Sequence, residues 1–354
     1  MNGHFFIPKL YDIMTFKKEY KNMKLQLTLN SLALILCCGD LIPSSTQPIS
    51  TQEWQEIEKT LKSAHKEPSM ITGMSIDTLT QIIGLDEFTA HKIEKRQKLL
   101  PDLFYALQNL ENQDIGVTTI YEEDYPASLR VLGTKMPLVI SYIGDLSLSY
   151  GVNISVAGPQ MMNKTMRHVT KEIMKKISKE GYTVVVGGSK GVEELALRTQ
   201  LTNNGNAVLF VADHMFDKIR LYSKYIKQNK LVIMTANDPY ALFDVTHALD
   251  KNLYICGMVF AQIVTGTHIG SGPVWFTSIQ NIHSHWTRQL VYETLDYSGN
   301  IRLIEMGEAH FTDEDLKSEV TLAEILDNHE TVIKKDDPSI DQMTIFEFIE
   351  DKHE

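Results

Sequence analysis

The sequence predicts an α/β protein, built as a Rossmann-like doubly wound parallel sheet preceded by a small helical domain. Two observations carry this prediction. From residue 153 onward, short β-branched runs alternate with segments of helical periodicity, which is typical of a parallel sheet covered by helices on both faces. Residues 23–112 instead show helical spacing of apolar residues without such runs. Hydrophobic residues make up 43% of the 354 residues, enough to bury a sizeable core.

The helical domain is predicted from apolar spacing and from capping signals. Leu29, Leu32 and Leu36 recur at the spacing of one helical face. Ser50 followed by Glu53 is a capping box, in which each side chain accepts a hydrogen bond from the backbone N–H of the other residue. Further helices are predicted over residues 77–83, over 91–100 up to Pro101, and over 102–110.

The Rossmann-like domain is predicted from seven short runs rich in β-branched residues. Between the first two runs, Val169, Ile173 and Ile177 fall on one helical face, as expected of a crossover helix. The preceding residues 113–150 form a connector in which prolines bar a long helix. The seven runs cover residues 154–158, 183–186, 207–211, 231–234, 259–264, 289–292 and 301–304.

These patterns divide the chain into four parts. They are an ill-defined extension over residues 1–22, the helical domain over 23–112, the Rossmann-like domain over 113–310 and an acidic flexible tail over 311–354. The tail has 14 acidic and 4 basic side chains, so it holds a balance of −10 out of the formal net charge of −11. The rest of the chain is nearly neutral, and its charge does not exclude nucleic-acid binding.

The cysteines and one apolar run bear on where the protein works. Cys37, Cys38 and Cys256 show neither a disulfide framework nor the spacing of zinc ligands, which fits a reducing cytosol. The apolar run over residues 32–38 resembles a lipoprotein signal, but it is short and lies far from Met1. We therefore expect a cytoplasmic protein without a membrane anchor.

Three glycine clusters follow predicted strands, and doubly wound sheets bind ligands at the carboxyl ends of their strands. Glycine lets the backbone approach a ligand closely, and a following helix points free N–H groups at it. Such turns favour a phosphate, from a nucleotide or a DNA backbone; the alternative is that the glycines only make tight turns. The clusters are Gly158, then Gly187, Gly188, Ser189, Lys190 and Gly191, then Gly270, Ser271 and Gly272. Neither G-x-G-x-x-G nor G-x-x-x-x-G-K-[ST] occurs, so no cofactor is expected.

The order and spacing of several motifs resemble the DprA/Smf family over roughly residues 24–310. The motifs are Asp124-Tyr125-Pro126 with Met136-Pro137, Val156-Ala157-Gly158-Pro159-Gln160, Gly187-Gly188-Ser189-Lys190-Gly191-Val192-Glu193, Lys251-Asn252-Leu253 and Gly270-Ser271-Gly272-Pro273-Val274-Trp275. The resemblance implies a homodimer that catalyses no reaction, binds single-stranded DNA and loads a RecA-type recombinase onto it, in natural transformation or related recombination. It also implies that the DNA-binding residues are the three glycine clusters together with Gln160, Lys251 and Asn252.

Two positions depart from the family pattern and remove positive charge. Gln160 stands where the family has an arginine, and Lys251-Asn252-Leu253 stands in place of its R-N-[RK] triplet. Each lost phosphate contact weakens DNA binding and reduces its salt dependence. Arg130, Lys164 and Arg167 are candidates to compensate, although a solvated helix face is favoured for the last two. The second functional hypothesis is therefore a sensor whose Rossmann pocket binds a nucleotide or a nucleotide-derived ligand.

Neither a catalytic site nor a metal site is expected. Related nucleotide-processing Rossmann folds carry a glutamate after their late glycine loop, but residues 270–276 contain no carboxylate, and hydrolysis needs a positioned base. Glu193 lies at a predicted helix start, where the helix dipole stabilises a carboxylate, so its position there does not require a catalytic role. His268, His283 and His285 have no carboxylate or cysteine ligand nearby, which favours surface or packing roles.

The tail contains one candidate partner motif. Gln342, Ile345 and Phe346 resemble the Q-x-x-[LI]-F peptide with which bacterial proteins bind the sliding clamp, where two apolar anchors enter a groove. The alternative is a short hydrophobic segment that folds back on its own domain.

Overall fold

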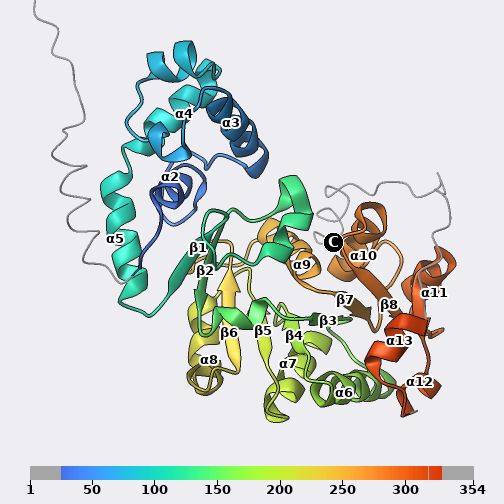
Figure 1. The fold of residues 1–354 in the computed structure, drawn as a ribbon. Coiled ribbons are helices and arrows are strands. Elements are labelled where there is room, and N and C mark those ends of the chain that lie inside the picture. The colour runs from blue at the N-terminus through green and yellow to red at the C-terminus, as the bar shows by residue number, and fades with distance from the viewer. Residues whose placement is uncertain (1–24, 318, 329–354) are drawn as a thin grey trace, which may run out of the picture. The chain divides into compact units, whose positions relative to one another are not determined.

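The computed structural model describes residues 25–317 and 319–328, and the chain divides into two compact units (Figure 1). The first unit comprises Met1–Tyr125, Gly133–Ile143 and Thr235–Leu242; the second comprises Pro126–Leu132, Gly144–Met234 and Phe243–Glu354. Within the described residues, none of the helices combines the length and the apolar character needed to cross a membrane. The predicted extension over 1–22 and the clamp-like residues Gln342, Ile345 and Phe346 lie outside the described residues.

The first unit is built mainly from helices, as the sequence predicts for this region. Its elements are α2 (Leu29–Cys38), α3 (Thr51–Ser63), the 3-10 turn η1 (Pro68–Ile71), the π-helical turn η2 (Thr78–Ile82), α4 (Glu87–Gln97), α5 (Leu100–Glu111), β1 (Gly116–Thr119) and β2 (Val139–Ile143). Strands β1 and β2 pair antiparallel. Each main helix buries an apolar face, with Leu34, Trp54, Ile93 and Leu107 fully buried on α2, α3, α4 and α5.

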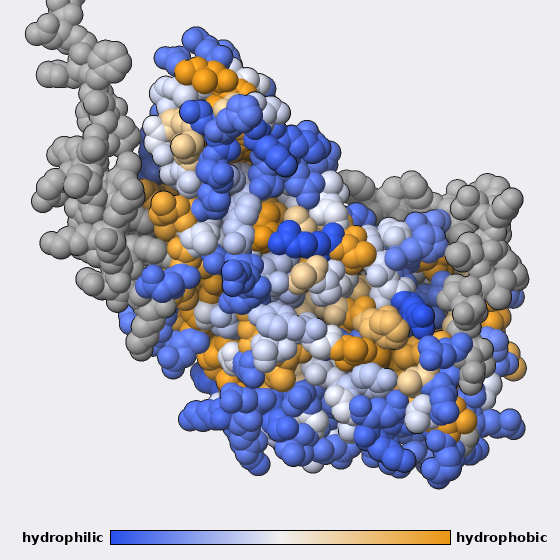
Figure 2. Space-filling view, in the orientation of Figure 1, coloured by the Kyte–Doolittle hydropathy of each residue, from blue (hydrophilic) through white to orange (hydrophobic). Residues whose placement is uncertain are grey.

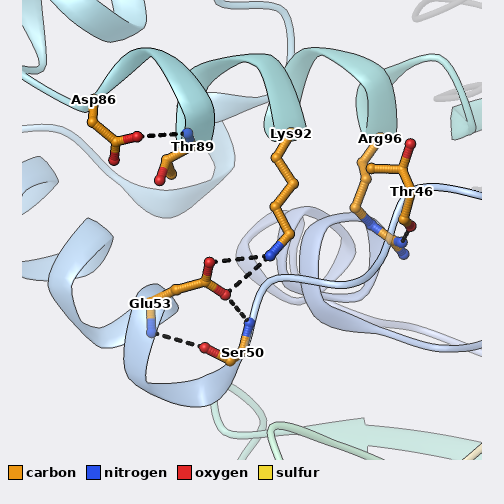
Figure 3. Close-up of polar contacts among 7 residues, drawn as sticks. All are labelled: Thr46, Ser50, Glu53, Asp86, Thr89, Lys92 and Arg96. Atoms are coloured by element: carbon orange, nitrogen blue, oxygen red, sulfur yellow. Dashed lines mark hydrogen bonds and ion pairs between the residues drawn. The ribbon is translucent and has the colours of Figure 1, made fainter.

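Polar side chains fix the ends of two of these helices (Figure 3). The expected capping box is present: Ser50 Oγ accepts from the N–H of Glu53 at 3.2 Å, and the Glu53 carboxylate accepts from the N–H of Ser50 at 2.6 Å. Lys92 on α4 donates to both Glu53 carboxylate oxygens at 3.1 Å, which ties α4 to the start of α3. Asp86 caps α4 by accepting from the N–H of Thr89 at 2.9 Å.

A buried arginine closes the end of α2. Arg96, on α4, is 1% exposed, and its guanidinium donates to the carbonyl oxygens of Leu36 at 2.7 Å, Gly39 at 2.6 Å and Thr46 at 3.0 Å. The last carbonyls of a helix have no partner within that helix. Arg96 therefore satisfies carbonyls at the end of α2 and, through Thr46, holds the loop that follows; Figure 3 shows the contact with Thr46.

The boundaries of several elements differ from the sequence-based prediction. The helix expected from His91 begins at Glu87, because the Asp86 cap lies upstream of the apolar spacing used to find it. Pro101 does not end a helix but lies in the first turn of α5, where the missing N–H of proline costs nothing. Residues 113–150, expected as a connector, contain the strands β1 and β2.

A parallel sheet forms the centre of the second unit. Its strands are β3 (Asn153–Ala157), β4 (Thr183–Val186), β5 (Ala207–Phe210), β6 (Leu231–Thr235), β7 (Ala261–Val264), β8 (Arg288–Tyr292) and β9 (Ala309–Phe311). They lie in the order β6-β5-β4-β3-β7-β8-β9, and neighbouring strands are parallel. Most of their side chains are buried, because helices cover both faces and leave the sheet no solvent side.

The chain winds outward from the middle of this sheet in two directions. The helices are α6 (Lys164–Lys179), α7 (Val192–Thr202), α8 (Met215–Lys227), α9 (Val245–Met258), α10 (Gly272–Ser284) and α11 (Ser298–Glu305), with the short 3-10 segments η3 (Ala127–Lys135) and η4 (Leu146–Ser149) earlier in the chain. Figure 1 shows α6 and α7 on one side of the sheet and α9 and α10 on the other. The order reverses between the neighbouring strands β3 and β7. The predicted doubly wound Rossmann-like sheet is confirmed.

Two predicted features near the C-terminus were wrong. Residues 301–304, expected as a strand, lie in α11, where the buried residues Asn300 and Leu303 are three apart as on a helix face, and Gly307 ends the turn with φ 104°. The flexible tail expected from residue 311 does not start there. Residues up to 328 include α12 (Asp313–Lys317) and α13 (Leu322–Asn328), which pack on α6 and bury Leu316, Leu322 and Ile325.

Candidate nucleic-acid interface

A pocket of about 160 Å³ opens in the second unit where the strand order reverses. Such switch points are where doubly wound sheets bind ligands. The pocket lies against the ends of β3 and β4, strand β7 and the helices α9 and α10. Its lining includes Ser155, Val156, Gly158, Gln160, Ser189, Glu193, Phe243, Leu249, Lys251, Asn252, Ile255, Gln262 and Val274.

A buried lysine is the main charge in this pocket. Lys251, on α9, is 7% exposed, and its Nζ lies 3.4 Å from Ser189 Oγ. Among the described residues, no carboxylate oxygen lies within 4 Å of this ammonium group. A Cβ added at Gly187 would lie 2.2 Å from Lys251 Nζ, so a larger residue there would require the lysine side chain to move. A buried cation with a single weak hydroxyl contact is a strong candidate partner for an anion.

A second lysine approaches the same turn from α8. Lys218 donates to the carbonyl oxygen of Gly188 at 3.2 Å, and Gly188 has φ 71°. Lys190, which the sequence indicates as a phosphate contact, is exposed and does not line the pocket. Lys190, Lys218 and Lys251 therefore surround the residue 187–191 turn with three positive charges. Sequence reasoning missed Lys218, because nothing in its local sequence marks it as part of a site 30 residues away.

The start of α7 is occupied by the protein's own groups. The Glu193 carboxylate accepts from the N–H of Ser189 at 2.9 Å, and the N–H of Val192 donates to the carbonyl oxygen of Pro159 at 3.3 Å. A Cβ at Gly191 would lie 2.4 Å from Pro159 O, which shows how closely the two loops pack. A phosphate would therefore bind the lysine side chains, or displace Glu193 from Ser189, rather than meet a free helix end.

Polar side chains form the floor of the pocket. Ser155 on β3 and Gln262 on β7 are partners in the strand register and are 2% and 3% exposed. Ser155 Oγ has no hydrogen-bond partner among the residues that the structure describes, while Gln262 Nε2 donates to Gln289 Oε1 on β8 at 3.3 Å. An unpaired buried hydroxyl costs free energy unless a ligand or water satisfies it. The floor can therefore hydrogen-bond a polar ligand group.

Apolar walls and an exposed aromatic ring complete the pocket. Val156, Leu249 and Val274 line it together with Phe243, whose side chain is 61% exposed. Aromatic rings next to cations are the surfaces on which unpaired bases stack. Phe243 could not be selected from the sequence, because it lies outside every motif noted above.

The remaining expected site residues fall around the pocket rather than all inside it. Gln160 and Asn252 line it, as does Gly158, where a Cβ would lie 2.2 Å from Thr265 Oγ1. Gly270, Ser271 and Gly272 do not line it, although Val274 of the same segment does. Gly272 has φ 80° and starts α10, so its glycine is needed for the turn.

Acidic and histidine side chains in the described part of the chain form no cluster of three or more that could hold a metal ion. Two of the three histidines considered in the sequence, His283 and His285, are exposed. His268 stacks on Tyr297 with ring centroids 5.1 Å apart, which is a packing contact.

Comparison with known proteins adds a family and a fold. The model of the DNA recombination-mediator protein A family matches residues 116–315. No curated protein matches the chain. The structure of DNA processing protein A from Streptococcus pneumoniae is similar with a TM-score of 0.66 at 16% identity, covering 86% of this chain and 99% of that one. DNA processing protein A from Helicobacter pylori, described for its single-stranded DNA binding mode, gives 0.50 at 15% identity, covering 60% and 97%.

Proposed function

Because this chain belongs to the DNA recombination-mediator protein A family, we propose that it binds single-stranded DNA in the pocket between β3 and β7. The observation that carries the proposal is Lys251, a buried cation whose one polar contact within the described part of the chain is a hydroxyl at 3.4 Å. In this proposal a backbone phosphate binds the Lys251 ammonium group, and Lys218 and Lys190 lie beside the same turn of residues 187–191. An unstacked base lies against Phe243 and the apolar walls.

The proposal extends to the protein's role in recombination. A protein that holds single strands protects them and can hand them to a RecA-type recombinase in the cytoplasm, during DNA uptake or repair. We propose this role, and a homodimer as the active form, on the strength of family membership. The pocket binds without a chemical step in this proposal, because its one carboxylate, Glu193, accepts a backbone hydrogen bond at the turn.

Binding of labelled oligothymidylate, followed by fluorescence anisotropy across a salt series, tests the site. Lys251→Met keeps the length and packing of the side chain and removes the charge. We expect the variant to bind more weakly and to lose about 0.7 from the slope of log affinity against log salt, the value for one phosphate on a single strand. Lys227→Ala, an exposed lysine on α8, is the matched control and should behave as wild type.

One observation favours the second hypothesis, a sensor of a nucleotide or a nucleotide-derived ligand. A pocket of about 160 Å³ with an unpaired buried hydroxyl is smaller than most ligand pockets, which suits a compact polar ligand. Competition distinguishes the two functions. A mononucleotide that binds tightly while oligothymidylate does not bind at low salt would support the sensor and contradict the DNA-binding proposal.

A further inference from the structure

Helix α6 presents a row of positive charges to solvent. Lys164, Arg167, Lys171, Lys175 and Lys179 are all exposed and follow one another at intervals of three or four residues. Residues at this spacing are neighbours on one face of a helix. Over its 16 residues α6 is about 24 Å long, so the row runs the length of the helix.

This arrangement is unfavourable for the helix itself. Like charges three or four residues apart repel each other, and cations near the first turn oppose the helix dipole. The first turn of α6 contains no acidic residue. The acidic residue that does pair on this face, Glu172, contacts Lys175 at 2.7 Å and lies within 3.8 Å of His168.

Neighbouring helices of the same unit handle their surface cations differently. On α7, Arg198 pairs with Glu194 at 2.7 Å, and on α8, Arg220 pairs with Asp217. In the described part of the chain, Lys164, Arg167 and Lys171 have no such carboxylate within 4 Å. An anion from outside the described residues would relieve the repulsion between these neighbouring cations of α6.

The row begins at the end of α6 that lies nearer the pocket in the chain. α6 begins after the loop that carries Gly158 and Gln160, both of which line the pocket. At the other end, Lys175 is paired with Glu172, and the half-buried neighbours of the row contact α13 and the residues just before it: Lys176 donates to Val320 O at 2.5 Å and the Glu180 carboxylate accepts from backbone N–H groups at the start of α13. Lys164, Arg167 and Lys171 therefore continue from the pocket rim along an uncovered helix face.

We propose that Lys164, Arg167 and Lys171 form a phosphate track that holds the backbone of the same single strand whose other part occupies the pocket. The inference rests on the proposed function. A nucleic-acid backbone fits this face better than an acidic protein does, because the described part of α6 exposes no large apolar side chain to anchor a protein. Protein interfaces are moreover depleted in lysine, whereas phosphate backbones recruit it.

The test measures the salt dependence of binding to an oligothymidylate of about 20 nucleotides, longer than one small module covers. The variant combines Lys164→Ala, Arg167→Ala and Lys171→Ala. The control combines Arg220→Ala, Lys224→Ala and Lys227→Ala, which removes the same charge from exposed positions of α8. Thermal unfolding of all three proteins checks that the fold is intact, since every substituted side chain is exposed.

The α6 variant should lose about 2 from the slope of log affinity against log salt, three contacts at about 0.7 each, while the control keeps the wild-type slope. An unchanged slope in the α6 variant overturns the inference, as does an equal loss in both variants. Polyglutamate that binds wild type and not the α6 variant, with the DNA slope unchanged, assigns the face to an acidic protein segment instead. If wild type binds no single-stranded DNA at low salt, the proposed function itself has failed.

Discussion

Arg96 shows how a buried cation is held mainly by backbone carbonyl oxygens, with Asp40 near enough to act on its charge. Its guanidinium reaches three carbonyl oxygens at 2.6–3.0 Å, and burial lowers its pKa from the usual range. Lys251 differs in that, over residues 25–317 and 319–328, its Nζ has one polar contact, the Ser189 hydroxyl at 3.4 Å. The contrast separates a structural cation, which is satisfied within the protein, from a candidate binding cation, which is not.

Replacement of Arg96 should therefore destabilise the first unit. Arg96→Leu leaves the carbonyls of Leu36, Gly39 and Thr46 without their donor, and we expect a loss of about 2–4 kcal/mol in the free energy of unfolding. Urea unfolding followed by circular dichroism measures it. Lys98→Ala, which removes an exposed ion pair with Glu94, should change stability by less than about 0.5 kcal/mol. A loss no larger than this in Arg96→Leu would contradict the structural role.

Glu308 links stability to pH. Burial raises the pKa of Glu308 to about 7. Because the folded-state pKa lies above the unfolded value near 4.5, the stabilising effect of the protonated form is complete below about pH 4.5 and is lost as pH rises through about 7. The wild-type protein should therefore be less stable at pH 8 than at pH 5, on the order of 2–3 kcal/mol from this group.

The variant Glu308→Gln isolates this effect, because glutamine does not ionise. Its stability should match that of wild type at pH 5 and exceed it at pH 8, as measured by urea unfolding at both values. Glu314→Gln, at an exposed position, serves as the control and should follow wild type at both. Parallel pH profiles of wild type and Glu308→Gln would show that the carboxyl group does not titrate in this range.

At the scale of elements, α13 depends on a side chain from a distant helix. The Glu180 carboxylate at the end of α6 accepts from the N–H groups of Leu322 at 2.6 Å and Ala323 at 3.2 Å, and so acts as the cap of α13. Glu180→Ala should cost about 1–2 kcal/mol and speed protease cleavage within residues 317–328. Lys179→Ala is the neighbouring control. Equal cleavage rates in the two variants would mean that α13 does not need this cap.

The sequence predicted elements well where one periodicity was unambiguous. Six of the seven β-branched runs are strands, because a buried parallel sheet demands continuous apolar residues. The seventh, 301–304, is a four-residue apolar run that fits a strand or a buried helix equally. Residues 311–328 were predicted as a flexible tail because of their many acidic residues. Leu316, Leu322 and Ile325 are nevertheless apolar residues that a core can bury.

The site was predictable only in part. Glycine turns and Lys251 are visible as motifs, but Lys218 and Phe243 reach the pocket from other elements, and only the folded chain brings them there. Ser155 and Gln262 did leave a signal. Each is a polar residue within an otherwise apolar strand run. A buried polar side chain in a strand needs a hydrogen-bond partner, so such a residue marks a candidate ligand contact.

For the molecule as a whole, we propose above all that the pocket between β3 and β7 holds single-stranded DNA. Three features converge there: a buried, weakly paired lysine, an unpaired buried hydroxyl and an exposed aromatic ring. Positive charge on the surface does not replace these three features. Exposed cations are screened by salt, and by themselves they bind any polyanion.

Photo-crosslinking of oligodeoxynucleotides carrying 5-iodouracil tests this claim most directly, because the modified base reacts with aromatic rings that stack on it. Crosslinked peptides are identified by mass spectrometry in wild type and in Phe243→Leu. We expect a crosslink at Phe243 that disappears in Phe243→Leu and weakens in Lys251→Met. Crosslinks confined to residues 25–125, with the peptide containing Phe243 unmodified, would contradict it.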